Sequence, residues 1–180
     1  MLSFFFESSS IMYQLFLVHL FATIFMTGLI WLIQVVHYPL MDGVGIDLFT
    51  SYEARHTQTI SWVVLPMMLI ELGTAVLLIL NPSVFSIKWL WIALILLLLI
   101  WGSTFFLQVP LHQQLSNNFD VNAHRKLVNS NWIRTILWSC RSGILLWCLY
   151  LVLTLKGSWN SSRFNQIICT SSPIFICLFS

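Results

Sequence analysis

Four of the five histidines in this 180-residue chain stand in polar stretches beside apolar segments, at His37, His56, His112 and His124. Histidine serves as a metal ligand or as an acid/base group near neutral pH, and a neighbouring carboxylate fixes its tautomer and raises its basicity. Glu53 supplies such a carboxylate beside His56, because residues three positions apart share one face of a helix. The same Glu-x-x-His spacing provides ligands in carboxylate-bridged di-metal bundles. These residues predict a small polar site.

Three interpretations of this site stay open at the level of sequence. In the first, the site holds a metal ion or a haem through His37, Glu53, His56 and His112. A single Glu-x-x-His is a weak signal for a di-metal site, which usually needs a second. In the second, an organic molecule binds without a metal: Arg134 holds an oxyanion, and the catalytic acid/base groups are His37, His56 and His112. In the third, the histidines are structural and bond to headgroups and loop backbone. The cofactor is therefore unknown.

The elements that carry these residues have the composition of membrane helices. Hydrophobic residues make up 58% of the chain and charged residues 8%, whereas a soluble domain carries roughly 25% charged residues. A helix needs about 20 apolar residues to cross a bilayer core. Four segments meet that need, at 11–36, 59–80, 89–109 and 131–155. We expect an all-α, integral membrane four-helix bundle.

This layout predicts a multi-pass protein of the plasma or an inner membrane, with both termini on one side and the lipid bilayer as its surroundings. The transmembrane domain then covers residues 1–155. The stretch 156–180 mixes serine and asparagine with short apolar runs, and we expect it to be a poorly ordered tail. The net charge of +2 is too small and too scattered to indicate nucleic acid as a partner.

The ends of the spans decide where the histidines lie. We expect Pro39 and Pro110 to end the first and third spans at equivalent places, because proline breaks a helix interior. That arrangement would bring His37 and His112 to the same level. Residues 52–56 are expected to form a short helix that runs into the second span.

The two halves of the chain are similar to each other, which indicates two tandem two-helix repeats. An offset of 70 residues aligns Phe49 with Phe119, Trp62 with Trp132, and Gly73 with Gly143. The same offset aligns Glu71 with Arg141, two charges inside otherwise apolar spans. An unpaired charge at that depth costs at least about 2.5–3.5 kcal/mol. We therefore expect the two to form a structural ion pair, with a proton or ligand relay as the alternative.

Polar side chains also recur at helical spacing within the spans, which predicts that they face the inside of the bundle. In the first span these are His19, Thr23, Thr27 and Gln34. In the third they are Trp101, Thr104 and Gln108, and in the fourth Asn131, Arg134, Trp138 and Arg141. Such residues commonly bond membrane helices to one another.

The second half of the chain carries a recognisable pattern in Pro110, Leu115, Trp132, Arg134 and Thr135. With these residues it resembles a family of small four-span membrane proteins of largely unknown function. Some fungal members are anthrone oxygenases, which put oxygen on polycyclic phenolic substrates. The resemblance implies the four-span architecture and, for activity, an oxygenase or other oxidoreductase. The first half of the chain departs from the family pattern.

The function that we expect is binding of a small hydrophobic molecule, aromatic or quinone-like, at one membrane interface, with oxidation of that molecule as a further step. The alternative is a non-catalytic structural or assembly subunit of a larger membrane complex. Nine tryptophans suit either case, since tryptophan is enriched at membrane interfaces. The partner is a small ligand in the first case and another membrane protein in the second.

Overall fold

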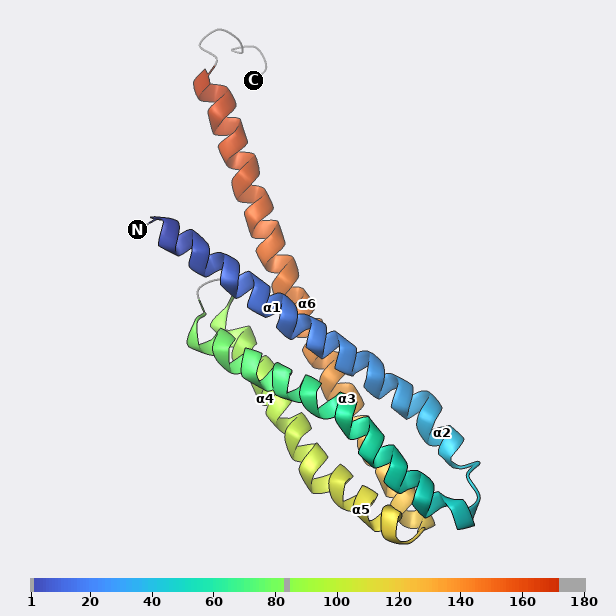
Figure 1. Ribbon diagram of the computed structural model, residues 1–180. Helices are drawn as coiled ribbons and strands as arrows, with labels where there is room; N and C mark the ends of the chain where they lie inside the picture. The colour runs from blue at the N-terminus through green and yellow to red at the C-terminus, as the bar shows by residue number, and fades with distance from the viewer. Residues whose placement is uncertain (1, 83–84, 172–180) are drawn as a thin grey trace.

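The chain folds into four long helical rods, shown in Figure 1. The computed structural model describes the backbone of residues 2–82 and 85–171, and the side chains of residues 10–82 and 85–154. The elements in order are α1 (Leu2–Leu32), η1 (Ile33–His37), α2 (Tyr38–Met41), α3 (Ile46–Leu80), α4 (Ile87–Ser103), η2 (Thr104–Gln108), α5 (Val109–Asn117) and α6 (Val121–Ser171). Here η denotes a π-helical turn. No strand occurs in the described part of the chain.

All four rods are long and apolar enough to cross a membrane: Ser10–Met41, Ile46–Leu80, Ile87–Asn117 and Val121–Thr154. The prediction of an all-α four-helix bundle is therefore confirmed, and the fold is that of a multi-pass membrane protein. In Figure 1 the α2–α3 and α5–α6 connections lie together at one end of the bundle. The α3–α4 connection lies at the opposite end, toward which α1 begins and α6 runs out.

The expected ends of the first and third spans at Pro39 and Pro110 are wrong. Each helix continues past its proline, to Met41 and to Asn117. A π-helical turn lies just before each proline, so that Tyr38 N–H bonds to the carbonyl of Ile33, five residues back. The wider turn relieves the clash of the proline ring with the carbonyl one turn earlier, so the helix continues although proline donates no hydrogen bond.

The π-helical turns recur at equivalent places in the two halves of the chain. The second one precedes Pro110, and Val109 N–H bonds to the carbonyl of Thr104, again five residues back. The repeat thus extends from sequence into backbone geometry. It also places equivalent residues together near the bundle axis: the rings of Phe49 and Phe119 lie 4.5 Å apart between centroids.

Residues 52–56, expected as a short helix, are part of α3, which starts at Ile46 and runs unbroken to Leu80. The predicted poorly ordered tail covers 156–180. Within it, α6 continues as helix to Ser171, while 172–180 lie outside the described residues. Both differences lengthen helices beyond the apolar segments, since a helix continues into water as long as no residue stops it.

Glu71 of α3 and Arg141 of α6, both fully buried, form a salt bridge in the bundle interior. The guanidinium also donates from Nε to the carbonyl of Ala93 at 3.1 Å and from Nη1 to Thr23 Oγ1 at 3.0 Å. Its Nη2 lies 2.9 Å from His19 Nε2. One arginine therefore joins all four rods, which is the role that a polar group serves in a lipid environment without a hydrophobic drive between helices.

The bonds around His19 settle its tautomer. A guanidinium only donates, so His19 Nε2 must accept from Arg141 and the ring proton sits on Nδ1. Nδ1 then donates to Thr74 Oγ1 at 2.6 Å, and that hydroxyl donates onward to the carbonyl of Ile70 at 2.6 Å. We call this network the central clamp (His19, Thr23, Glu71, Thr74 and Arg141). Its side chains donate their hydrogen bonds to one another and to the helix backbone, as in a structural element.

Most residues of the predicted inward stripes are buried, whereas Thr27, Trp101 and Thr104 are half-buried. His19, Thr23 and Gln34 of the first rod are buried, and Asn131, Trp138 and Arg141 of the fourth are fully so. Gln34 accepts from Asn131 Nδ2 at 2.8 Å, one layer nearer the end that holds most histidines. The outer faces are apolar, as lipid contact requires; Phe106, for example, is 81% exposed.

Candidate functional site

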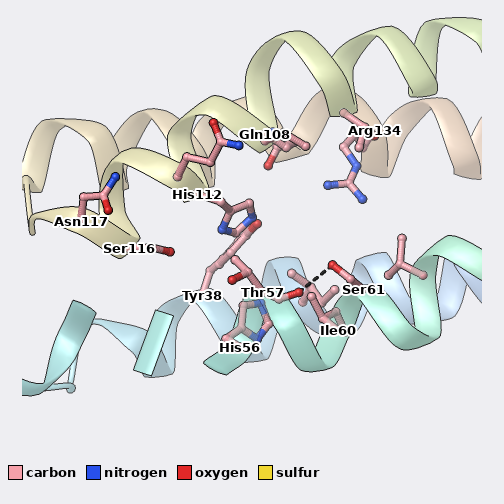
Figure 2. Close-up of a pocket in the computed structure, with 15 residues that line it drawn as sticks. Tyr38, His56, Thr57, Ile60, Ser61, Gln108, His112, Ser116, Asn117 and Arg134 are labelled. Atoms are coloured by element: carbon pink, nitrogen blue, oxygen red, sulfur yellow. Dashed lines mark hydrogen bonds between the residues drawn. The ribbon is translucent and has the colours of Figure 1, made fainter. Parts of the chain in front are cut away.

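A cavity of about 360 Å³ opens between α3 and α5 near the end where the α2–α3 and α5–α6 connections meet. Figure 2 shows its two walls, α3 on one side and η2 with α5 on the other. The polar side chains lining it are Tyr38, His56, Thr57, Ser61, Thr104, Gln108, His112, Gln113, Ser116, Asn117 and Arg134. Ile33, Ile60, Val64 and Val109 supply apolar wall.

The histidine with the strongest partner is His112 on α5. Its Nδ1 pairs with a carboxylate oxygen of Glu53 on α3, a residue with no exposed surface. The carboxylate holds the ring proton on Nδ1 and leaves Nε2 as the proton acceptor. The second oxygen of Glu53 is buried and has no hydrogen-bond partner in the described part of the chain.

His56 stands between the other two predicted histidines. Its ring stacks on His37 with centroids 4.1 Å apart, and its centroid lies 6.1 Å from that of His112. Glu53 and His56 do point to the same side of α3, as their spacing predicts. The three histidines and the carboxylate therefore converge at one end of the bundle, although His37 stacks behind His56 and does not line the cavity.

The fit of these residues to a metal ion is poor. Metal ligation needs ring nitrogens whose lone pairs converge in the planes of the rings. His37 and His56 instead lie nearly parallel, 25° between planes, and present faces to each other. His112 Nδ1 is bonded to Glu53, so this histidine could offer a metal only its Nε2 atom. Among the residues that the structure describes, no three histidine, cysteine or acidic side chains form a group that could hold a metal.

Arg134 of α6 lines the inner wall of the cavity and is only 7% exposed. Its guanidinium carbon lies 5.3 Å from the ring centroid of Trp138, a cation–π contact. Figure 2 shows the guanidinium reaching into the space between the two walls. It makes no hydrogen bond or ion pair with any described residue, and its Nε atom is buried without a partner.

Trp138 links this arginine to the centre of the bundle. The indole is fully buried and its Nε1 donates to Glu71 at 3.2 Å. Glu71 is the carboxylate that binds Arg141 through its other oxygen. The cavity wall is therefore anchored on the central clamp, about two helical turns deeper.

Two further findings concern the positions of His124, Gln108 and Tyr38. His124, grouped with the other histidines, lies apart and pairs with Asp42 at 3.3 Å across the α2–α3 connection. Gln108 and Tyr38 line the cavity but were not among the expected site residues. Gln108 is the last residue of η2, as His37 is the last residue of η1. An offset of 71 residues, one more than the offset that aligns the rest of the repeat, pairs Gln108 with His37 and could have predicted it.

Comparison with protein-family models, with curated proteins and with solved structures finds no significant match for this chain.

Proposed function

We propose that this multi-pass membrane protein binds a small ring-bearing hydrophobic molecule, aromatic or quinone-like, in the cavity between α3 and α5 and accepts a proton from it. The observation that carries the proposal is the pairing of His112 with the buried carboxylate of Glu53 at the cavity wall. A histidine held by a carboxylate and facing a cavity has the composition of a general base with its orienting group.

The cavity suits a molecule of this class in size and lining. Its volume of about 360 Å³ falls in the range of small-molecule sites, which are mostly apolar with a few placed polar groups. It lies where the apolar segments of the rods give way to polar residues, so an apolar molecule dissolved in the bilayer reaches it at the interface. His56, beside His112 and stacked on His37, extends the polar rim toward water.

The chemical step that the residues support is transfer of a hydroxyl proton to His112 Nε2. Glu53 stabilises the resulting imidazolium, and a positioned base of this kind contributes about 10²–10⁴-fold to a rate. The deprotonated molecule is more electron-rich than the parent phenol. The resemblance to anthrone oxygenases extends the proposal to oxidation of that species, with dioxygen as the oxidant.

The test uses the purified protein in lipid nanodiscs and naphthol as the probe, because naphthol and naphtholate differ in absorption. We expect wild type to bind naphthol and to display the naphtholate band at a pH where free naphthol is protonated. His112→Gln should lose that band and still bind naphthol. His124→Gln, in the separate pair with Asp42, is the matched control and should behave as wild type.

Three results would contradict the proposal. A naphtholate band that persists in His112→Gln would show that His112 is not the base. A stoichiometric metal in the purified protein that is lost in His56→Ala would favour the metal interpretation. Absence of any naphthol binding would favour the alternative of a non-catalytic subunit, which pull-down of an endogenous membrane complex would then examine.

A further inference from the structure

No carboxylate of the described residues pairs with the buried cation of Arg134. Its side chain is more than nine-tenths buried, its Nε has no partner, and it lies against the face of Trp138. A buried charge is strongly unfavourable unless it is paired and hydrogen-bonded. A tryptophan face offsets part of that cost, but it occupies only the flat side of the guanidinium. The N–H edges stay available toward the cavity.

Each carboxylate of the described residues either has a partner other than Arg134 or lies at the surface. Glu53 pairs with His112, and Glu71 with Arg141 and Trp138. The other three lie on the surface or its loops: Asp42 faces His124, Asp47 is exposed in the first turn of α3, and Asp120 accepts from Asn122 N. No acidic side chain in the described part of the chain is therefore left for Arg134.

The guanidinium is also held in place rather than free to leave. Trp138 is fixed by its bond to Glu71, which the central clamp fixes in turn. A long arginine on a membrane helix normally extends to the interface to keep its charge in water. Here it stays inside a cavity wall, in the same cavity as His112. This is the arrangement of a preformed anion site.

We propose that the molecule bound in this cavity is an organic oxyanion, a ring carrying a phenolate, enolate or carboxylate group whose oxygen pairs with the N–H edge of Arg134. The inference rests on the proposed function and deepens it by naming the charge of the ligand. The two groups then have separate roles: His112 with Glu53 takes a proton where the ligand arrives neutral, and Arg134 holds the negative oxygen. A ligand that arrives ionised needs Arg134 alone.

Three probes of similar ring size separate these features: methylnaphthalene, which carries no oxygen; naphthol, which must lose a proton; and naphthoate, which is already ionised. Binding is measured by calorimetry in nanodiscs of neutral phosphatidylcholine. Wild type should bind naphthoate roughly 10- to 100-fold more tightly than methylnaphthalene, the range for one charge-assisted hydrogen bond. Arg134→Met should lose that preference and keep methylnaphthalene binding, while Arg134→Lys should retain part of the preference.

A second measurement does not depend on a variant that folds. At equal free concentration, naphthoate should raise the midpoint of thermal unfolding of the wild-type protein more than methylnaphthalene does, because the ligand that binds the native state more tightly stabilises it more. Equal binding of naphthoate and methylnaphthalene would overturn the inference and leave the proposed function standing. A naphthoate preference that survives Arg134→Met would overturn it as well. If none of the three probes binds, the proposed function fails, and this inference with it.

Discussion

The indole Nε1 of Trp138 donates a hydrogen bond of 3.2 Å to one oxygen of Glu71, whose other oxygen binds Arg141. One carboxylate thus serves two elements of the fold. Through Arg141 it joins the four rods, and through Trp138 it supports the ring on which Arg134 rests. The central clamp and the candidate site are connected by this single side chain.

Trp138→Phe should therefore affect both stability and the site. Phenylalanine keeps an aromatic face under Arg134 but leaves an oxygen of Glu71 without its donor. We expect a loss of about 1–3 kcal/mol in the free energy of unfolding, the usual cost of a buried acceptor left unsatisfied. Naphthoate affinity should also fall, because a less constrained ring positions Arg134 less well. Chemical or thermal unfolding in nanodiscs measures the first effect and calorimetry the second.

The matched control for that variant is Trp147→Phe. Trp147 is on the same helix, is 49% exposed and stacks on Tyr150 at 5.5 Å, away from the clamp. Its replacement should change stability by less than about 0.5 kcal/mol. Equal losses in the two variants would mean that the bond to Glu71 is not what Trp138 contributes.

The ion pair itself is tested by a double-mutant cycle with Glu71→Gln and Arg141→Gln. Removal of either partner leaves a buried charge uncompensated, which should cost about 3–5 kcal/mol. The double variant should lose much less than the sum of the two single losses, because it has no orphaned charge. Losses that simply add would show that the two residues are not coupled, and would contradict the clamp.

The pairing of Glu71 with Arg141 could be predicted from the sequence. Hydrophobic patterning places both charges at a similar depth inside apolar spans. Because an unpaired charge there is costly, the sequence predicts that the two side chains lie close together. The inward stripes follow in the same way from helical spacing. The convergence of Glu53, His56 and His112 was also within reach, because Glu53 and His56 share a face of one helix.

Other features depend on backbone detail that residue types do not encode. Pro39 and Pro110 each predict a helix end, and a local π-helical turn cancels that prediction. The separation of His124 from the other histidines follows from the exact turn between α5 and α6. The sequence predicts Arg134 as an oxyanion-binding residue, but it does not show which carboxylates lie near it. Only three-dimensional packing reveals that every described carboxylate lies elsewhere.

The arrangement of the connections predicts the outcome of labelling from the two sides of the membrane. Gly45 and Asn118 lie in the α2–α3 and α5–α6 connections at one end, and Asn81 follows α3 at the other. In a variant without the native cysteines, cysteine at position 45 or 118 should react with an impermeant maleimide from one side, and cysteine at 81 from the other. Reaction of 45 and 118 from opposite sides would exclude this bundle as a membrane topology.

Glu53→Gln separates the orienting role of the carboxylate from its charge. The amide oxygen can still accept the proton of His112 Nδ1, so the ring should keep its position and naphthol affinity should change little. The neutral amide cannot stabilise an imidazolium, however, and the site loses the negative charge that balances it. We expect the fraction of bound naphthol that is present as naphtholate at a fixed pH to fall several-fold, because the imidazolium formed with it is no longer stabilised by a carboxylate.

The absorption spectrum of the naphthol complex at fixed pH measures that fraction directly. The control is Asp42→Asn, which removes the carboxylate from the other histidine–carboxylate pair of the described residues. Asp42 is 71% exposed at its side chain and its partner His124 lies outside the cavity, so the naphtholate fraction should not change. A naphtholate fraction that stays at the wild-type value in Glu53→Gln would mean that His112 acts without its carboxylate. A naphtholate fraction that falls equally in both variants would place the effect in the fold near the α2–α3 connection, since only loss of structure is common to the two changes.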